Sequence, residues 1–458
     1  MTEQHPSLEL TPAQRDRSMK FAIIVASCTV VAEYASAGNI LTLVSLKLGA
    51  QELFIGALSF FALAPSLFGV FTMSAIERMG KRRVLVFWHS IASIFFIPFL
   101  LLPVLTRYWS AKACLAVVLI AVLLKSTLNA LASTGWFPLL QDIIPEDITG
   151  RFFAKLRTCW QSAGLVTIAF ASWLLGKQPD WWKFQLLFGI ALLGYIARAA
   201  SITQMSERPP LPHHTSRRSI ISKVIDFLGE RELRFLMLYI CFYMFAAAIC
   251  EPFKIKMLKD LGYSDGFILA ATAMLGLGAI ISLHFWGRLA DRFGNRAIFS
   301  ISHAGMIVST FMWIMVGKSA FDSVLIFILY ICYSIFHSGN GIAQTRYILH
   351  AVPSNKQNYI NIINMATIFS WAVAPLLGGL FLTLTKNHSF HSSAATPENY
   401  RILFITAAAL FIIPHLLRRK LKLAKDTPTM HVIAFVTRPL RNLFGPFVNT
   451  GGTKDSEE

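Results

Sequence analysis

Residues 287–296 read GRLADRFGNR, and residues 73–82, about half a chain earlier, read MSAIERMGKR. In both stretches an acid (Asp291 or Glu77) precedes an arginine, and a glycine and a second arginine follow at the same spacing. Each stretch follows one long apolar run and precedes another. A charged loop that recurs between apolar runs predicts a membrane protein built from two related halves.

The apolar runs continue along most of the chain. Hydrophobic residues make up 55% of the sequence and charged residues 14%, too few charges for the surface of a soluble protein of 458 residues. Runs of about 18 apolar residues are long enough to cross a bilayer, and continuous runs suit helices rather than barrel strands. We predict twelve spans, at residues 20–46, 53–76, 84–106, 113–139, 157–176, 184–204, 233–253, 265–287, 297–317, 322–344, 360–384 and 401–417.

The predicted fold is an all-α integral membrane protein with twelve transmembrane helices in two pseudo-symmetric halves of six. A polar, proline-containing loop separates the halves, and its later part has apolar residues at helical spacing, typical of an amphipathic surface helix. The expected parts are an N-terminal tail (1–19), the N-terminal half (20–204), the central loop (205–232), the C-terminal half (233–417) and a basic tail (418–458).

The net charge of +18 does not indicate nucleic-acid binding, because lysine and arginine gather in the loops on one side of the predicted membrane. This bias predicts that both termini are cytoplasmic, and we expect a bacterial inner-membrane protein in contact with membrane lipid. The polar N-terminus does not resemble a cleavable signal peptide. The six cysteines lack metal-type spacing, so we expect no disulfide, metal or cofactor. We expect a monomer.

The chain resembles the major facilitator superfamily. The resemblance is carried by the loop at residues 287–296, through Gly287, Leu289, Asp291, Arg292, Gly294 and Arg296, with support from PEDITGRFF at residues 145–153. The earlier copy departs from the pattern, with Met73, Ala75 and Glu77 in place of glycine, leucine and aspartate. The resemblance implies a secondary transporter whose first, fourth, seventh and tenth helices line a central cavity. It does not indicate the substrate.

Ionisable side chains at bilayer depth usually face a cavity or a partner. Glu33 and Lys125 lie near the middle of the first and fourth spans, where they are candidates for a coupling or substrate site or for a static ion pair. Glu251, at the end of the seventh span, is a candidate gate or cavity acid, although an interfacial acid is an equally good interpretation. Weaker candidates are Tyr34, Gln161 and Tyr243.

Polar residues form stripes on two spans. Lys125, Asn129 and Trp136 share one face of the fourth span, and the tenth span repeats the pattern with Tyr330, His337, Asn340 and Gln344. Matching stripes in both halves predict a midplane site between the repeats. Polar contacts between helices are the structural alternative. His337 is a candidate proton relay.

The two repeated loops are candidate cytoplasmic gates, whose acids and arginines would latch one transport state. Positive charge that only sets topology is the alternative. The expected gate residues are Glu77, Arg78, Gly80, Arg82, Asp142, Arg151, Asp291, Arg292, Gly294 and Arg296.

The function predicted from these features is secondary transport of a small organic solute by alternating access, coupled to H⁺. A sugar or an organic anion is favoured as the solute, since Lys125 suits a negative group. The alternatives are a uniporter or a drug or metabolite exporter of the same superfamily, a transport-dead sensor, and a membrane-embedded transferase. We expect no enzymatic activity, because no catalytic cluster is apparent.

Overall fold

The structure is a computed structural model, which describes residues 10–72, 76, 78–145, 148–208, 220–352, 358–385 and 398–421. These residues form helices and contain no strand. Twelve helical segments in them are long and apolar enough to cross a membrane, as predicted. The all-α fold is therefore confirmed.

The first six spans come from the N-terminal part of the chain. They consist of α1 (Pro12–Ser36) and α2 (Gly38–Lys47); α3 (Glu52–Leu63) with the 3₁₀ segment η2 (Ala64–Thr72); α5 (Lys81–Ile94) and α6 (Ile97–Tyr108); α7 (Ala111–Ser133) and α8 (Trp136–Ile143); α9 (Thr149–Leu175); and α10 (Trp181–Thr203).

The last six spans follow a short helix, α11 (Ile220–Gly229), which lies in the region predicted to form an amphipathic surface helix. They consist of α12 (Arg231–Ala248) and α13 (Glu251–Asp260); α14 (Asp265–Phe293); α15 (Asn295–Phe311) with η4 (Met312–Met315); α16 (Ala320–Ala351); α17 (Asn358–Thr385); and α18 (Glu398–Leu410), α19 (Ile412–Leu417) and η6 (Arg418–Lys420).

Helix α1 begins earlier than the predicted first span. The Thr11 hydroxyl accepts a hydrogen bond from the Gln14 amide, the Thr11 amide donates one to the Gln14 side-chain oxygen, and Pro12 occupies the first turn. This capping box explains why the helix extends into residues that are polar and were predicted as a tail. The boundary between tail and half at residue 19 stays a prediction.

The first span of each half is broken near its middle. Between α1 and α2 the chain passes through Ala37 in an extended conformation and Gly38 at φ +51°, which glycine adopts more easily than other residues. Between α12 and α13 the break falls at Ile249 and Cys250, just before Glu251. Broken helices expose backbone groups and are tolerated at bilayer depth where they line a cavity.

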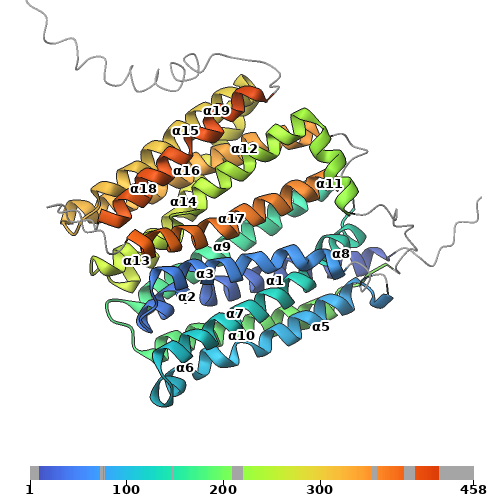
Figure 1. The fold of residues 1–458 in the computed structure, drawn as a ribbon. Helices are drawn as coiled ribbons and strands as arrows, with labels where there is room; N and C mark the ends of the chain where they lie inside the picture. Colours follow the sequence, from blue (N-terminus) through green and yellow to red (C-terminus); the bar gives the residue numbers. More distant parts are fainter. Residues whose placement is uncertain are drawn as a thin grey trace, which may run out of the picture.

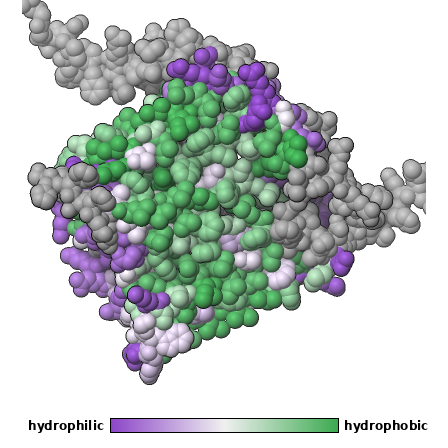
Figure 2. Space-filling view, in the orientation of Figure 1, coloured by the Kyte–Doolittle hydropathy of each residue, from purple (hydrophilic) through white to green (hydrophobic). Residues whose placement is uncertain are grey.

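The helices run side by side, with the N-terminal six spans on one side of the molecule and the C-terminal six on the other (Figure 1). Apolar side chains cover the middle of the face in Figure 2, and polar side chains gather towards the ends of the helices. Many large apolar side chains are exposed, such as Trp173 at 77%. This apolar belt and the twelve spans indicate a multi-pass integral membrane protein.

The two ends of the bundle differ. We call the end that carries residues 78–82 and 291–296 the motif end. At the opposite end the halves are joined: the Gly266 amide donates to the Gly176 carbonyl at 2.8 Å, and Lys256 lies 3.4 Å from Glu52. The backbones of the two halves also approach closely at Gly379, whose added Cβ would lie 2.6 Å from the Glu52 carbonyl oxygen.

Candidate functional site

A cavity of about 500 Å³ lies between the two halves. Both broken spans contribute to it, through Gly38 and Asn39 on one side and Glu251 on the other. Helices α3, α7, α10, α14, α16 and α17 complete its walls. Of the predicted site residues, the structure brings five together here: Glu33, Lys125, Asn129, Glu251 and Tyr330.

Lys125 is the main buried cation of this cavity. Its residue is only 6% exposed, and its ammonium lies 4.8 Å from the centre of the Phe96 ring and 5.9 Å from that of Phe99. The static ion pair with Glu33, one of the two alternatives, does not form; the ammonium faces these two rings on the neighbouring third span. Cation–π contacts partly replace hydration, but they do not neutralise the charge.

Arg198 is a site residue that the sequence interpretation missed. It lies on α10, is 6% exposed, and donates from Nη1 to the Asn129 side-chain oxygen at 3.2 Å. Its guanidinium also lies 5.8 Å from the ring centre of Tyr195, another cavity residue. The available signal was an arginine inside a predicted span, which is costly in a membrane unless it has a function or a partner.

The C-terminal wall holds a second buried lysine. Lys254 is fully buried, and its ammonium lies 2.5 Å from Glu251 Oε1. Aromatic rings surround it: the centre of Tyr333 is 4.1 Å away, and those of Trp313 and Tyr330 are 5.4 and 5.8 Å away. Glu251 is thus a cavity acid with its own counter-ion, rather than an interfacial acid without a partner.

The remaining residues of the tenth-span stripe lie inside the C-terminal half, outside the cavity lining. Tyr243 donates to or accepts from His337 Nδ1 at 3.1 Å. Asn340 accepts from Tyr239 and donates to Gln344 at 3.4 Å. Contacts among helices α12, α15 and α16 account for this stripe, as the structural alternative proposed, and Tyr330 alone of the stripe faces the cavity.

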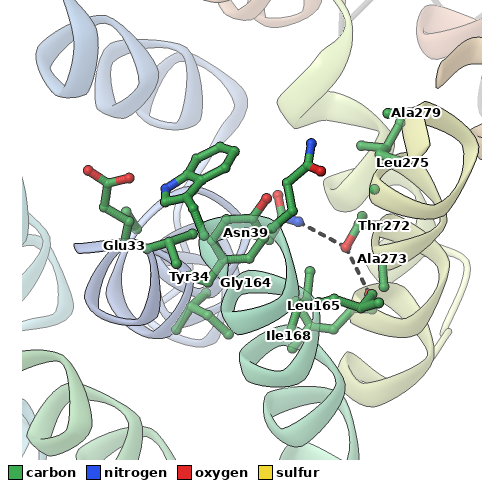
Figure 3. A pocket seen from close by; sticks show the side chains of 18 of the residues that line it. Glu33, Tyr34, Asn39, Gly164, Leu165, Ile168, Thr272, Ala273, Leu275 and Ala279 are labelled. Carbon is green, nitrogen blue, oxygen red and sulfur yellow. Dashed lines mark hydrogen bonds between the residues drawn. The ribbon is translucent and has the colours of Figure 1, made fainter. Parts of the chain in front are cut away.

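Three other candidates lie elsewhere. Trp136 packs against an apolar cluster of the N-terminal half with Leu139 and Leu140. Tyr34 and Gln161 line a second space of about 480 Å³ between α1, α9 and α14 (Figure 3). This space borders the central cavity at Glu33 and Asn39, which line both.

At the motif end, the two repeated glycines have the same geometry. Gly80 and Gly294 have φ of +85° and +80°, and each precedes the first residue of the next helix. Two ion pairs lie nearby, each within one half: Lys81 lies 2.6 Å from Asp142, and Asp291 pairs with Arg346. Lys81 and Arg346 were not among the gate residues predicted from the sequence.

The other gate candidates are placed as follows. The Arg82 backbone amide donates to Glu207 at 2.8 Å, and its guanidinium donates to the Met205 carbonyl at 3.0 Å. Arg78 and Arg151 are exposed, Arg292 lies over the Phe293 ring, and Arg296 is the second residue of α15. Glu77, the acid of the earlier motif copy, is outside the described residues.

Comparison with known proteins agrees with this architecture. Residues 235–446 match the Major Facilitator Superfamily, so the sequence signal comes from the C-terminal half. No curated protein sequence matches the chain. The fold of both halves is similar to that of solved transporters of this type. The chain is therefore similar to the major facilitator superfamily in the sequence of residues 235–446 and in its fold.

Three solved structures illustrate the shared fold. The nucleoside transporter NupG has 12% identity and a TM-score of 0.63, over 89% of this chain and 98% of that one. A bacterial homologue of the human lysosomal transporter Spinster, inward-facing and unoccupied, has 14% identity and a TM-score of 0.66, over 89% and 97%. A D-xylose-proton symporter has 12% identity and a TM-score of 0.62, over 87% and 96%.

These identities are low, so the likeness establishes the fold and not the cargo. The family match over residues 235–446 and the shared fold together support a membrane transporter of small solutes. The recognition made from the loop at residues 287–296 is confirmed. The residues that select the solute must be argued from the cavity itself.

Proposed function

We propose that this protein transports a small organic anion by alternating access, coupled to H⁺, with its substrate site in the central cavity. The observation that carries the proposal is the position of Lys125: a buried ammonium beside the cavity, with aromatic rings but no carboxylate as its neighbours. A buried charge without a counter-ion is costly. An anionic solute would supply the missing counter-charge.

The charges of the two walls support an anion over a cation. The N-terminal wall places the Lys125 ammonium at the cavity, and the Arg198 guanidinium contacts the lining residue Asn129, against the single carboxylate of Glu33. On the C-terminal wall, Glu251 and Lys254 form a pair that is neutral as a unit. The site therefore has an excess of positive charge, and Asn129 adds an amide that can hydrogen-bond a carboxylate or phosphate.

A neutral sugar is the second candidate. Tyr330 and Trp371 line the cavity and offer flat faces on which a sugar ring can stack, and one structural relative is a D-xylose-proton symporter. A sugar would leave the Lys125 charge uncompensated, so we rank it below an organic anion.

The proposal for proton coupling rests on Glu33. It faces both spaces beside the break in the first span, and no described ion pair holds it, whereas Glu251 is paired with Lys254. A carboxyl group without a fixed counter-ion can exchange a proton with the cavity as the site opens to each side. Of these two acids, Glu251 then has the structural role, as the ion-pair partner of Lys254.

The proposed topology places the motif end in the cytoplasm, because the basic loops gather there. With the halves joined at the opposite end through Glu52, Lys256, Gly176 and Gly266, the structure corresponds to a cytoplasm-facing state. Alternating access would then require these contacts to separate.

The test is transport by purified protein in liposomes that contain a pH-sensitive dye. A panel of small monocarboxylates and sugars is added outside, and solute-driven entry of protons is recorded. We expect flux with anions, loss of flux in Lys125→Ala, and partial retention in Lys125→Arg. Lys112→Ala is the matched control, because Lys112 lies on the same helix but is exposed at its end.

Glu33→Gln separates coupling from binding. We expect it to abolish proton entry while leaving exchange of labelled for unlabelled anion across the membrane. Anion flux that is unaffected by Lys125→Ala would refute the proposed site. Sugar flux that is the same in the wild type and in Lys125→Ala would favour the second candidate. Flux of either solute without proton movement would identify a uniporter.

A further inference from the structure

The space between α1, α9 and α14 is a second chamber that borders the central cavity. Ala37, Gly38, Asn39 and Thr272 line both. The Asn39 side-chain amide donates to the Thr272 hydroxyl at 2.9 Å across this junction, as Figure 3 shows. The second chamber, of about 480 Å³, is nearly as large as the first. A solute that extends from one into the other must displace the Asn39–Thr272 hydrogen bond.

The two chambers differ in chemistry. The central cavity contains the buried cation Lys125 and the polar residues around it. The side chains of the second chamber are mainly apolar, and its lining includes Leu165 and Ile168 from α9 and Leu275 and Ile280 from α14. Leu165 and Ile280 are also 37% and 42% exposed on the apolar surface of the bundle. The polar and apolar spaces meet at Glu33 and Asn39.

We propose that the solute is an amphipathic organic anion, whose charged group binds near Lys125 and whose hydrocarbon part occupies the second chamber. This inference rests on the anion site proposed above and adds the apolar part of the substrate. The junction at Asn39 and Thr272 marks where the polar group ends and the hydrocarbon begins. A chamber of several hundred Å³ with apolar walls is typical of sites that bury the apolar part of a small ligand.

One glycine allows the second chamber to be filled without disturbing the fold. Gly276 lines it from α14, and a Cβ added there would meet no atom within 4 Å. A leucine at this position therefore projects into free space and occupies part of the chamber. Gly189 on α10 is the matched control, because its Cβ would also meet nothing within 4 Å and it lines neither chamber.

The experiment measures binding of straight-chain carboxylates from butanoate to decanoate to the full-length protein in nanodiscs, corrected for partition into empty nanodiscs. Burial of each methylene group in an apolar site should strengthen binding about fourfold. We expect this dependence on chain length in the wild type and in Gly189→Leu. In Gly276→Leu it should disappear, while butanoate binds as in the wild type.

Three results would overturn the inference. Affinity that is independent of chain length in the wild type would mean that the chamber takes no part in binding. A dependence that survives in Gly276→Leu would place the hydrocarbon elsewhere. Methyl decanoate binding as tightly as decanoate would identify the chamber as a lipid site that requires no anion. By contrast, butanoate binding that is unchanged in Lys125→Ala would refute the anion site itself. This result distinguishes failure of the anion site from failure of the apolar chamber.

Discussion

Replacing Gly379 with alanine should shift the transporter away from the state seen in the structure. The new Cβ would lie 2.6 Å from the Glu52 carbonyl oxygen and 3.2 Å from Leu53 Cα. Both neighbours are backbone atoms of α3, so no side-chain rotation can relieve the clash. Helices α17 and α3 must move apart by about 0.8 Å to restore ordinary contact, and such overpacking typically costs about 1–3 kcal/mol.

This cost applies only while the halves are joined at the opposite end. If the clash disappears when they separate there, the population open at that end should rise about 5- to 150-fold, since about 1.4 kcal/mol corresponds to a factor of ten. The assay uses a variant without the six native cysteines that carries Thr42→Cys, a cavity position. The rate of alkylation by an impermeant maleimide, added from the opposite-end side of oriented vesicles, should rise by that factor.

Two further variants make the result interpretable. Gly56→Ala places its Cβ 2.4 Å from the Pro375 carbonyl oxygen in the same α3–α17 interface, and should act in the same direction. Gly189→Ala, whose Cβ meets nothing, should leave the rate unchanged. An unchanged rate in both interface variants, with normal thermal stability, would show that the halves do not separate along α3 and α17.

Other changes test the motif end and the buried charges. Asp291→Asn removes the partner of Arg346 and should reduce the rate of uptake while membrane insertion stays normal; wild-type uptake would contradict the latch. Lys254→Met leaves Glu251 without its counter-ion and should lower stability by about 3 kcal/mol, measured by thermal unfolding. Adding Glu251→Gln to that variant should recover most of the loss, and failure to do so would mean that Lys254 stabilises mainly through its aromatic neighbours. Arg198→Gln should weaken anion binding while Arg157→Gln, on an exposed face of α9, should not; equal effects would exclude a specific role for Arg198.

The fold was predictable because its signals are local and repeated. Twelve apolar runs and the loop at residues 287–296 each depend on neighbouring residues only. The breaks within the first and seventh spans were not predicted, because Gly38 and Cys250 interrupt helices whose apolar runs continue across them. Hydropathy records whether a segment suits the membrane, and it does not record where a helix ends within it.

The site was only partly predictable, for a geometric reason. Lys125, Glu33 and Glu251 were identified because a charge in an apolar span is costly wherever it points. The tenth-span stripe was ambiguous, since a polar face can meet a cavity or another polar helix. In the structure Asn340 forms hydrogen bonds with Tyr239 and Gln344. Only these three-dimensional contacts show that the stripe joins helices. Arg198 and Lys254 carried the same signal as Lys125, and only their partners show that they belong to the cavity walls.

The two buried lysines show how similar local environments lead to different roles. Each half holds one ammonium against aromatic rings beside the cavity: Lys125 against Phe96 and Phe99, and Lys254 against Tyr333 and its neighbours. Lys254 has Glu251 one helical turn away, so its charge is satisfied whether or not a solute is bound. Lys125 has no such partner on its own helix, and Glu33, on α1 of the same half, forms no ion pair with it. Because only the uncompensated lysine gains a counter-charge when an anion enters, the N-terminal half should determine which solute binds, while the Glu251–Lys254 pair keeps the C-terminal wall neutral as the halves move.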